Sequence, residues 1–336
     1  MRLLLHIGTG KTGSTAIQAS LDANRDLLAE AGILYPKLAG RIDHNKLAIA
    51  ANHGVPREFR QLVEKNGRDL VGEAAWAEAR LSLARSEGDT IVLSCEYFSA
   101  GVDVERLCRL LEIHFPRVRE IATVCYLRPP AASYLSTLQQ DIKASSLVSP
   151  LRRRAYAPLL ARYAHLGTVT ARLFHRSVLR EGDVVRDFLD FLPARLDRSR
   201  FAYLPDTNVS ISAEGMAVLQ EFRRDIFPSE DNIFKPASNR LLKQIQEIEA
   251  QLRPGSLSKP RLRPEIVSYL SRETEDSRAL RKAFGVDFHR VEPAVTNDAF
   301  DGFVPPNNFG RNLSAVLLWN EEAKALLVSR LLDSLL

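Results

Sequence analysis

The sequence of 336 residues is poor in features that would assign it to a specialised class of protein. Its cysteines, Cys95, Cys108 and Cys125, are odd in number and form no CxxC pair, which argues against a disulfide framework and against a zinc site. No run approaches the roughly 20 apolar residues of a membrane span. The apolar run at the N-terminus is short and interrupted by His6, unlike a signal peptide. We therefore expect reduced thiols and a cytoplasmic protein without an integral membrane segment.

A strong charge of one sign is also missing. Lysine and arginine number 46 against 41 aspartates and glutamates, which gives a net charge of +5. This dispersed excess is compatible with an anionic ligand but does not indicate a nucleic-acid binder. No histidine pair or carboxylate cluster has the spacing of metal ligands, so we expect no bound metal. With 45% hydrophobic and 26% charged residues, the chain has the composition of an ordinary globular protein.

The pattern of apolar residues predicts an α/β fold. Residues 3–7, 90–94 and 121–127 are apolar runs with little polar interruption, typical of parallel strands that are covered on both faces. Helical spacing of apolar residues follows the first run, over 15–31. Another strand is expected at 169–174, and further helices at 74–84, 104–113, 131–142 and 184–191. We expect a central parallel sheet with helices on both sides.

Beyond about Ser210 the pattern is helical and no strand is expected. Helices are predicted at 213–227 with Ser212 as its N-cap, at 239–252 and at 264–284, with loops at 253–264 and 292–310. A last helix opens at Asn320 and places leucines on one side, namely Leu326, Leu327, Leu331 and Leu335. It is expected to pack on the domain or on a partner subunit, which leaves a homodimer open.

The most informative stretch lies between the first strand and the first helix. It reads His6-Ile7-Gly8-Thr9-Gly10-Lys11-Thr12-Gly13-Ser14-Thr15. Loop amides and the N-terminus of the helix would point at one spot and attract an anion, and glycines let the backbone approach that ligand closely. Lys11 adds a mobile charge, and Ser14 and Thr15 add hydroxyl donors. The stretch therefore predicts a phosphate-binding loop.

The order of residues in this loop separates it from the usual nucleoside-triphosphate loop. That motif is G-x-x-x-x-G-K-[ST], whereas here Lys11 precedes the last glycine. Lys-Thr-Gly-Ser-Thr directly after a strand resembles the 5′-phosphosulfate loop of sulfotransferases that use 3′-phosphoadenosine 5′-phosphosulfate (PAPS). The resemblance implies that a single loop holds the 5′-phosphate and the sulfuryl group, through Gly10, Lys11, Thr12, Gly13, Ser14 and Thr15.

A second signature of the same family is a strand that ends in arginine, with a serine eight residues later on the next helix. Arg128 follows the apolar run 121–127, and 136 minus 128 is 8, which points to Ser136. An arginine at a strand end and a serine in the following helix can converge on one phosphate at the edge of a sheet. By resemblance, Arg128 and Ser136 bind the 3′-phosphate of PAPS.

Other segments are similar to the bacterial branch of the family. They are Asp43-His44-Asn45, Leu93-Ser94-Cys95-Glu96, residues 180–189 and Asn208-Val209-Ser210-Ile211-Ser212. The resemblance implies a P-loop-like three-layer fold, with a sulfotransferase-like α/β domain over 1–290 and an extension over 291–336. It implies transfer of a sulfuryl group from PAPS, without a metal, to a hydroxyl or amine of a small-molecule or glycan acceptor, most plausibly a carbohydrate.

Two residues are candidates for the general base that takes the acceptor proton. Glu96 ends an expected strand at the same sheet edge as Lys11, and its other expected role is to orient that lysine or a loop amide. His44 lies in a polar loop and has an ordinary pKa near neutrality, although a lone loop histidine is often merely exposed. His6, inside the first strand, is expected to be a core residue.

Two other classes of function stay open from the residues alone. A P-loop kinase or nucleotide hydrolase would need a metal-holding aspartate after a strand and a lysine after the last glycine. Neither occurs at the expected place. An inert nucleotide-binding scaffold would keep the fold without turnover, but the presence of Lys11, Arg128 and Ser136 together argues against it.

Overall fold

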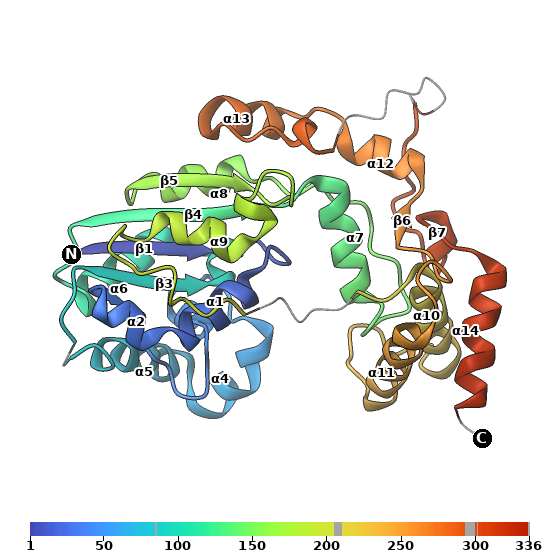
Figure 1. Cartoon of the computed structure of the whole chain (residues 1–336), viewed down its shortest axis with the longest axis horizontal. Coiled ribbons are helices and arrows are strands. Elements are labelled where there is room, and N and C mark those ends of the chain that lie inside the picture. The colour runs from blue at the N-terminus through green and yellow to red at the C-terminus, as the bar shows by residue number, and fades with distance from the viewer. Residues whose placement is uncertain (85, 205–209, 293–299, 301, 335–336) are drawn as a thin grey trace. The chain divides into compact units, whose positions relative to one another are not determined.

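The computed structural model describes residues 1–84, 86–204, 210–292, 300 and 302–334, and the chain divides into two compact units (Figure 1). Each unit is assembled from three stretches of sequence. The first comprises 1–128, 155–207 and 273–291, and the second comprises 129–154, 208–272 and 292–336. The last stretch of the first unit ends at Val291, and residues 129–154 and 208–272 belong to the second unit with the C-terminal stretch.

The first unit is built on a five-stranded sheet in which every pairing is parallel. The strands are β1 (Arg2–Ile7), β2 (Ile33–Leu34), β3 (Thr90–Cys95), β4 (Glu120–Leu127) and β5 (Thr168–Leu173). Their order across the sheet is β2-β3-β1-β4-β5, so the first strand is the central one. The expected α/β fold with a central parallel sheet is confirmed.

The apolar runs form strands because both faces of the sheet are buried. Along β1, Leu3 and Leu5 belong to one hydrophobic cluster and Leu4 belongs to another. Successive side chains of a strand point to opposite faces, so these clusters mark the two sides of the sheet. Both sides are covered by helices, which is why polar alternation is missing from the sequence of this strand.

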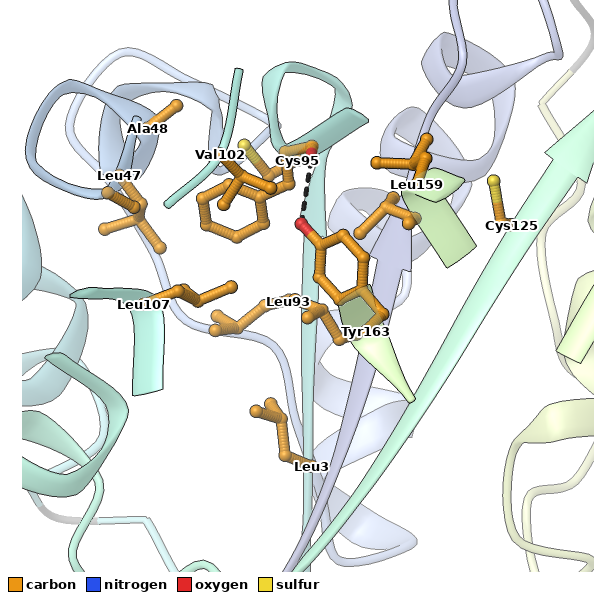
Figure 2. Packing of buried hydrophobic residues seen from close by; sticks show 14 of the residues in the cluster. Leu3, Leu47, Ala48, Leu93, Cys95, Val102, Leu107, Cys125, Leu159 and Tyr163 are labelled. Atoms are coloured by element: carbon orange, nitrogen blue, oxygen red, sulfur yellow. Dashed lines mark hydrogen bonds between the residues drawn. The ribbon is translucent and has the colours of Figure 1, made fainter. Parts of the chain in front are cut away.

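One face of the sheet is covered by helices of the first unit. Figure 2 shows this cluster, with Leu3 and Leu93 from the sheet, Leu107 from one helix and Leu159 from another. The hydroxyl of buried Tyr163 donates a hydrogen bond of 2.8 Å to the carbonyl of Phe98, the bond dashed in Figure 2. The helices that cover this face are α3 (Ala48–Ala51), α5 (Arg68–Leu81), α6 (Val104–His114), α8 (Ala157–Tyr163) and α13 (Glu275–Phe284). A further helix, α4 (Arg60–Asn66), precedes α5.

The other face is covered by α1 (Ser14–Ala23), α2 (Arg25–Glu30) and α9 (Val184–Phe188). The single helix expected over 15–31 is therefore two helices. The break falls at Asn24, whose buried amide donates to the carbonyls of Ser20 at 2.7 Å and Ala202 at 2.8 Å. An asparagine that bonds the backbone competes with helical hydrogen bonds, which explains the interruption.

The second unit is mainly helical, as expected, and contains α7 (Pro130–Asp141), α10 (Ala213–Ile226), α11 (Pro236–Gln251), α12 (Pro264–Ser271) and α14 (Glu321–Asp333). The expectation that it has no strand was wrong. Two short strands, β6 (Arg261–Leu262) and β7 (Leu317–Leu318), pair antiparallel. Strands of two residues are too short to show the alternation of apolar and polar residues that predicts a strand.

The expected helix over 264–284 is also two helices. It breaks after Ser271, and Thr274 forms a capping box with Ser277 at the start of α13. The predicted caps elsewhere are confirmed, since Ser212 accepts from the amide of Gly215 and Asn320 accepts from that of Ala323. These cap positions could be predicted because a capping bond depends only on neighbouring residues.

The last helix packs within its own unit. In α14, Leu327 and Leu331 are buried in the cluster that also contains α10 and α11, whereas Leu326 is 39% exposed. The predicted Leu335 and the segment Asn208-Val209 lie outside the described residues. None of the helices in the described ranges combines the length and the apolar character that crossing a bilayer requires.

Candidate functional site

The carboxyl edge of the sheet brings the loop after β1 next to Glu96. In the parallel register, Ile7 is paired with Cys95 of β3 on one side and with Cys125 of β4 on the other. The backbone of Gly8 passes so close to β3 that a Cβ atom placed on it would lie 3.3 Å from Cα of Glu96. Loops that leave a sheet at such an edge are the usual ligand-binding positions of open α/β folds.

The loop turns sharply because three of its residues adopt positive φ angles. The values are 76° for Gly10, 56° for Lys11 and 75° for Gly13. Glycine adopts this region without steric cost, but a lysine does so at a cost in backbone strain. Residues held in such strained conformations cluster at ligand-binding sites, so Lys11 marks the loop as a candidate site.

The N-terminus of α1 offers its amides to this loop. Gly13 is the N-cap and has no side chain to accept a hydrogen bond from the first turn, and that turn contains no acidic residue. The positive end of the helix dipole is therefore not compensated by its own first turn. An anion is the ligand that such a helix end favours.

Two buried hydroxyl groups at the same place point independently to a ligand. Oγ1 of Thr12 and Oγ of Ser14 have no hydrogen-bond partner among the residues that the structure describes. Thr12 is fully buried and Ser14 is 4% exposed. Ser14 Oγ points toward the turn, since a Cβ atom on Gly8 would lie 2.5 Å from it. Buried hydroxyls normally have partners, and a bound oxyanion would supply one to each.

Contacts on both sides hold the loop in place. The Thr9 hydroxyl donates to the carbonyl of Tyr126, at 2.7 Å, which ties the loop to β4. On the other side Gly13 packs against α9, since a Cβ atom placed on Gly13 would lie only 2.6 Å from Cγ1 of Val184. A loop fixed in this way can keep its donors oriented before a ligand arrives.

Glu96 lies against this loop. Its amide donates to Oδ1 of Asn45 at 2.8 Å, and its carboxylate oxygen Oε1 lies 3.4 Å from the position that a Cβ atom of Gly10 would take. The structure thus brings the loop and Glu96 together, as the sequence predicted. Both expected roles of Glu96, proton acceptor and organiser of the loop, fit this position.

His44 occupies a different environment from the expected exposed loop. It is 1% exposed, its Nε2 lies 2.8 Å from the carbonyl of Pro36, and its Nδ1 accepts from the amide of Ser94 at 3.0 Å. Burial lowers the pKa of His44 to about 4. Both ring nitrogens therefore bond the backbone, which fixes the loop that carries His44 to β3.

His6 is a core residue, as predicted. It is fully buried, its Nδ1 lies 2.8 Å from Oγ of Ser94, and burial lowers its pKa to about 4. Gln18 of α1 also donates to Ser94 Oγ, at 3.1 Å. This polar contact explains how a histidine can lie inside a strand beneath the loop.

The two residues of the second signature belong to different compact units. Arg128 directly follows β4, and its guanidinium lies over the ring of Phe174 at 4.9 Å. Ser136 lies on α7 in the second unit and is 9% exposed. Pro130 is the first residue of α7, a position that the fixed φ of proline suits.

Sequence reasoning missed a set of charged and aromatic residues around Glu96. Arg41 bonds both oxygens of Asp43, at 2.8 and 2.9 Å, and Glu58 at 3.1 Å. Burial and the charges of Glu58 and Glu96 raise the pKa of Tyr97 to about 12. No local spacing could reveal this network, because its members come from three separate loops of the first unit.

Comparison with known proteins adds no relative. No protein-family model matches the chain, and no curated protein matches it. In the described part of the chain, no group of three or more histidine, cysteine, aspartate or glutamate residues is arranged to hold a metal ion.

Proposed function

We propose that this protein is a PAPS-dependent sulfotransferase that moves a sulfuryl group to a hydroxyl or amine of an acceptor. The observation that carries the proposal is the loop after β1, where an uncapped helix end and two buried hydroxyls without partners among the described residues, Thr12 Oγ1 and Ser14 Oγ, meet a strained Lys11. Such a site suits a tetrahedral oxyanion. The residue order Lys-Thr-Gly-Ser-Thr supports phosphosulfate in particular, by its resemblance to the sulfotransferase loop.

The strand order supports a P-loop-like form of the fold. The loop follows the central strand of the order β2-β3-β1-β4-β5, so strand ends on both sides can contribute side chains to one ligand. Glu96 follows the neighbouring strand β3 on one side, and Arg128 follows the neighbouring strand β4 on the other. In this proposal Gly10 to Thr15 hold the 5′-phosphosulfate, and Arg128 holds the 3′-phosphate.

The chemistry is an in-line displacement at sulfur. The acceptor oxygen forms a bond to sulfur while the bond between sulfur and the 5′-phosphate oxygen breaks, and that oxygen keeps the electron pair. Lys11 and the hydroxyls of the loop stabilise its growing negative charge. The acceptor proton passes to a base, and adenosine 3′,5′-bisphosphate is released.

We propose Glu96 as this base. Its carboxylate lies against the phosphate loop, whereas both ring nitrogens of His44 bond the backbone. With a pKa of about 4, His44 cannot give a rate that falls on acidification through about pH 6 to 7. A pH–rate profile with that limb, abolished by His44→Ala, would assign the base to His44 instead.

The acceptor in this proposal is a small molecule or a glycan, and a carbohydrate is the favoured class. The three cysteines are free, with two of them buried, which supports a reducing cytoplasm as the compartment.

Calorimetric titration tests the proposal against a kinase or nucleotide hydrolase. Adenosine 3′,5′-bisphosphate should bind to the full chain without a metal, and ATP with magnesium should bind far more weakly. The reverse preference would overturn the proposal. Transfer of labelled sulfate from PAPS to a screen of glycans, phenols and amines then separates an enzyme from an inert scaffold, which would bind the bisphosphate without turnover.

A further inference from the structure

The second unit contains an open cavity that the proposed sulfuryl transfer does not use. It has a volume of about 340 Å³, which lies in the range of small-molecule sites. Six of its nine lining residues are polar: Asp141, Ser145, Ser149, Asn232, Asn307 and Asn308. The other three form an apolar part of the wall, with Val148 among them. The cavity therefore presents both hydrogen-bonding groups and apolar surface to a ligand.

A buried arginine fixes the two loops that carry most of this wall. Arg223 of α10 is fully buried, and its guanidinium donates to the carbonyls of Ala144 at 2.6 Å and Glu230 at 2.6 Å. It also donates to the carbonyl of Ile233 at 3.1 Å. These carbonyls flank Ser145 on one loop and Asn232 on the other. A buried charge with several partners holds both loops in one arrangement.

Asp231 and a backbone bond complete the frame. Oδ1 of Asp231 accepts from the hydroxyl of Ser145 at 2.8 Å and from the amide of Ser146 at 2.8 Å. The amide of Val148 donates to the carbonyl of Gly310 at 2.8 Å, which joins the third stretch of the wall. The cavity is thus preformed, and a ligand would not have to order its walls.

The functional groups on the wall define the class of ligand. Amides and hydroxyls can donate and accept hydrogen bonds, which matches the hydroxyl groups of a sugar. Asp141 is the single charged group among the nine lining residues, and no cation among them would hold an anion. Its carboxylate accepts from Ser149 Oγ, and Asn308 Oδ1 accepts from the amide of Gly310 at 2.7 Å, so both side chains are held in position.

We propose that this cavity binds a neutral saccharide unit, with Asp141 accepting sugar hydroxyls and the amides of Asn307 and Asn308 bonding others. The apolar part of the wall, which includes Val148, would contact the C–H groups of the ring. An anionic sugar would meet the carboxylate of Asp141 without a cation to compensate it. The inference does not rest on sulfuryl transfer, because no residue of the phosphate loop lines the cavity.

Saturation-transfer NMR on the full chain tests this site, without PAPS or bisphosphate present. The probes are the methyl glycosides of glucose, galactose, mannose and N-acetylglucosamine, with methyl glucuronide as the anionic comparison. At least one neutral glycoside should receive saturation and bind with a millimolar dissociation constant, and the glucuronide should bind more weakly. Failure of all four neutral probes, or a preference for the glucuronide, overturns the proposal.

Two variants localise the binding. Asp141→Asn should weaken it by roughly tenfold to a hundredfold, since the lost bonds involve a charged group. Asn307→Ala changes an exposed side chain and should weaken it by about two- to tenfold without affecting the fold. Gln61→Ala removes an exposed amide from α4 in the first unit and serves as the control, with unchanged affinity. Equal affinity in Asn307→Ala, Asp141→Asn and the control would place the bound sugar elsewhere.

Discussion

The loop after β1 in the first unit and the loops around Arg223 in the second unit differ in how their buried polar groups are paired. In the first unit, the hydroxyls of Thr12 and Ser14 are buried without a partner among the described residues. In the second, the guanidinium of Arg223 donates to four acceptors, and Asp231 accepts from both Ser145 and Ser146.

An unsatisfied buried group costs about 1 to 3 kcal/mol, a cost that a ligand can remove. A side chain that bonds several acceptors instead fixes the chain around it. Under the functions proposed above, the first set of residues binds a ligand and the second set fixes the shape of the cavity. Mutations in the first set should change turnover or affinity, and mutations in the second should change stability.

The largest effect on turnover is expected at Glu96. Glu96→Gln should reduce the rate by about a hundredfold to ten-thousandfold, which is the usual contribution of a general base. Affinity for adenosine 3′,5′-bisphosphate, measured by calorimetry, should stay nearly unchanged, since the base contacts the acceptor proton. Glu58→Gln, in the neighbouring network, is the matched control and should retain most activity. A parallel loss of bisphosphate affinity in Glu96→Gln would show that Glu96 organises the loop instead.

The largest effect on stability is expected at Arg223. Arg223→Leu leaves three carbonyls without their donor and should lower the free energy of unfolding by about 1 to 3 kcal/mol for each carbonyl that stays unpaired. Urea unfolding of the full chain measures this change. Arg224→Leu, next to it on α10 but paired on the surface with Asp225, should change it by less than about 1 kcal/mol. Similar values for the two variants would contradict the scaffold role.

Lys11→Ala should reduce turnover by on the order of a hundredfold to a thousandfold, since it removes a charge that stabilises the leaving oxygen. The free energy of unfolding should change by less than about 1 kcal/mol, because truncating this partly exposed side chain leaves no cavity in the core. Sulfate transfer from labelled PAPS and urea unfolding check the two quantities. Near-normal turnover would show that this loop is not the reaction centre.

Gly8→Ala should disturb the loop by crowding. The added Cβ atom would lie 2.5 Å from Ser14 Oγ and 3.3 Å from Cα of Glu96, and overpacking of this kind costs about 1 to 3 kcal/mol. Bisphosphate affinity should fall together with stability. Gly54→Ala is the control, because its Cβ atom would meet no atom within 4 Å. An unaltered affinity in Gly8→Ala would show that the phosphate site does not depend on this close approach.

A further effect is a pH dependence of stability that comes from the first unit. The folded-state pKa of His6 and of His44 is about 4, below the ordinary 6.5, so only the unfolded chain binds these protons between the two values. Stability should therefore fall as the pH falls from about 6.5 to 4, by up to about 1.4 kcal/mol per pH unit for each histidine.

Urea unfolding at pH 7, 6 and 5 measures this slope. His44→Gln should make the slope shallower. His165→Gln, which changes an exposed histidine, should leave the slope unchanged. An identical slope in His44→Gln would show that His44 is protonated with an ordinary pKa in the folded protein.

Features that depend on neighbouring residues could be predicted from the sequence. The runs 3–7, 90–94 and 121–127 predicted three strands because apolar residues on both sides of a strand require cover on both faces. Ser212 and Asn320 predicted helix starts because capping bonds reach only two or three residues along the chain. The glycine-rich loop after β1 was visible for the same reason, since its residues are consecutive.

Tertiary structure decided what depends on residues far apart in the chain. It broke the expected first helix at Asn24, through a hydrogen bond to Ala202, and it buried His44 between Pro36 and Ser94. It also assembled the second unit and its cavity from three separate stretches. A sequence pattern records how a residue relates to its neighbours, whereas burial and long-range hydrogen bonds set the pKa of a histidine and the wall of a cavity.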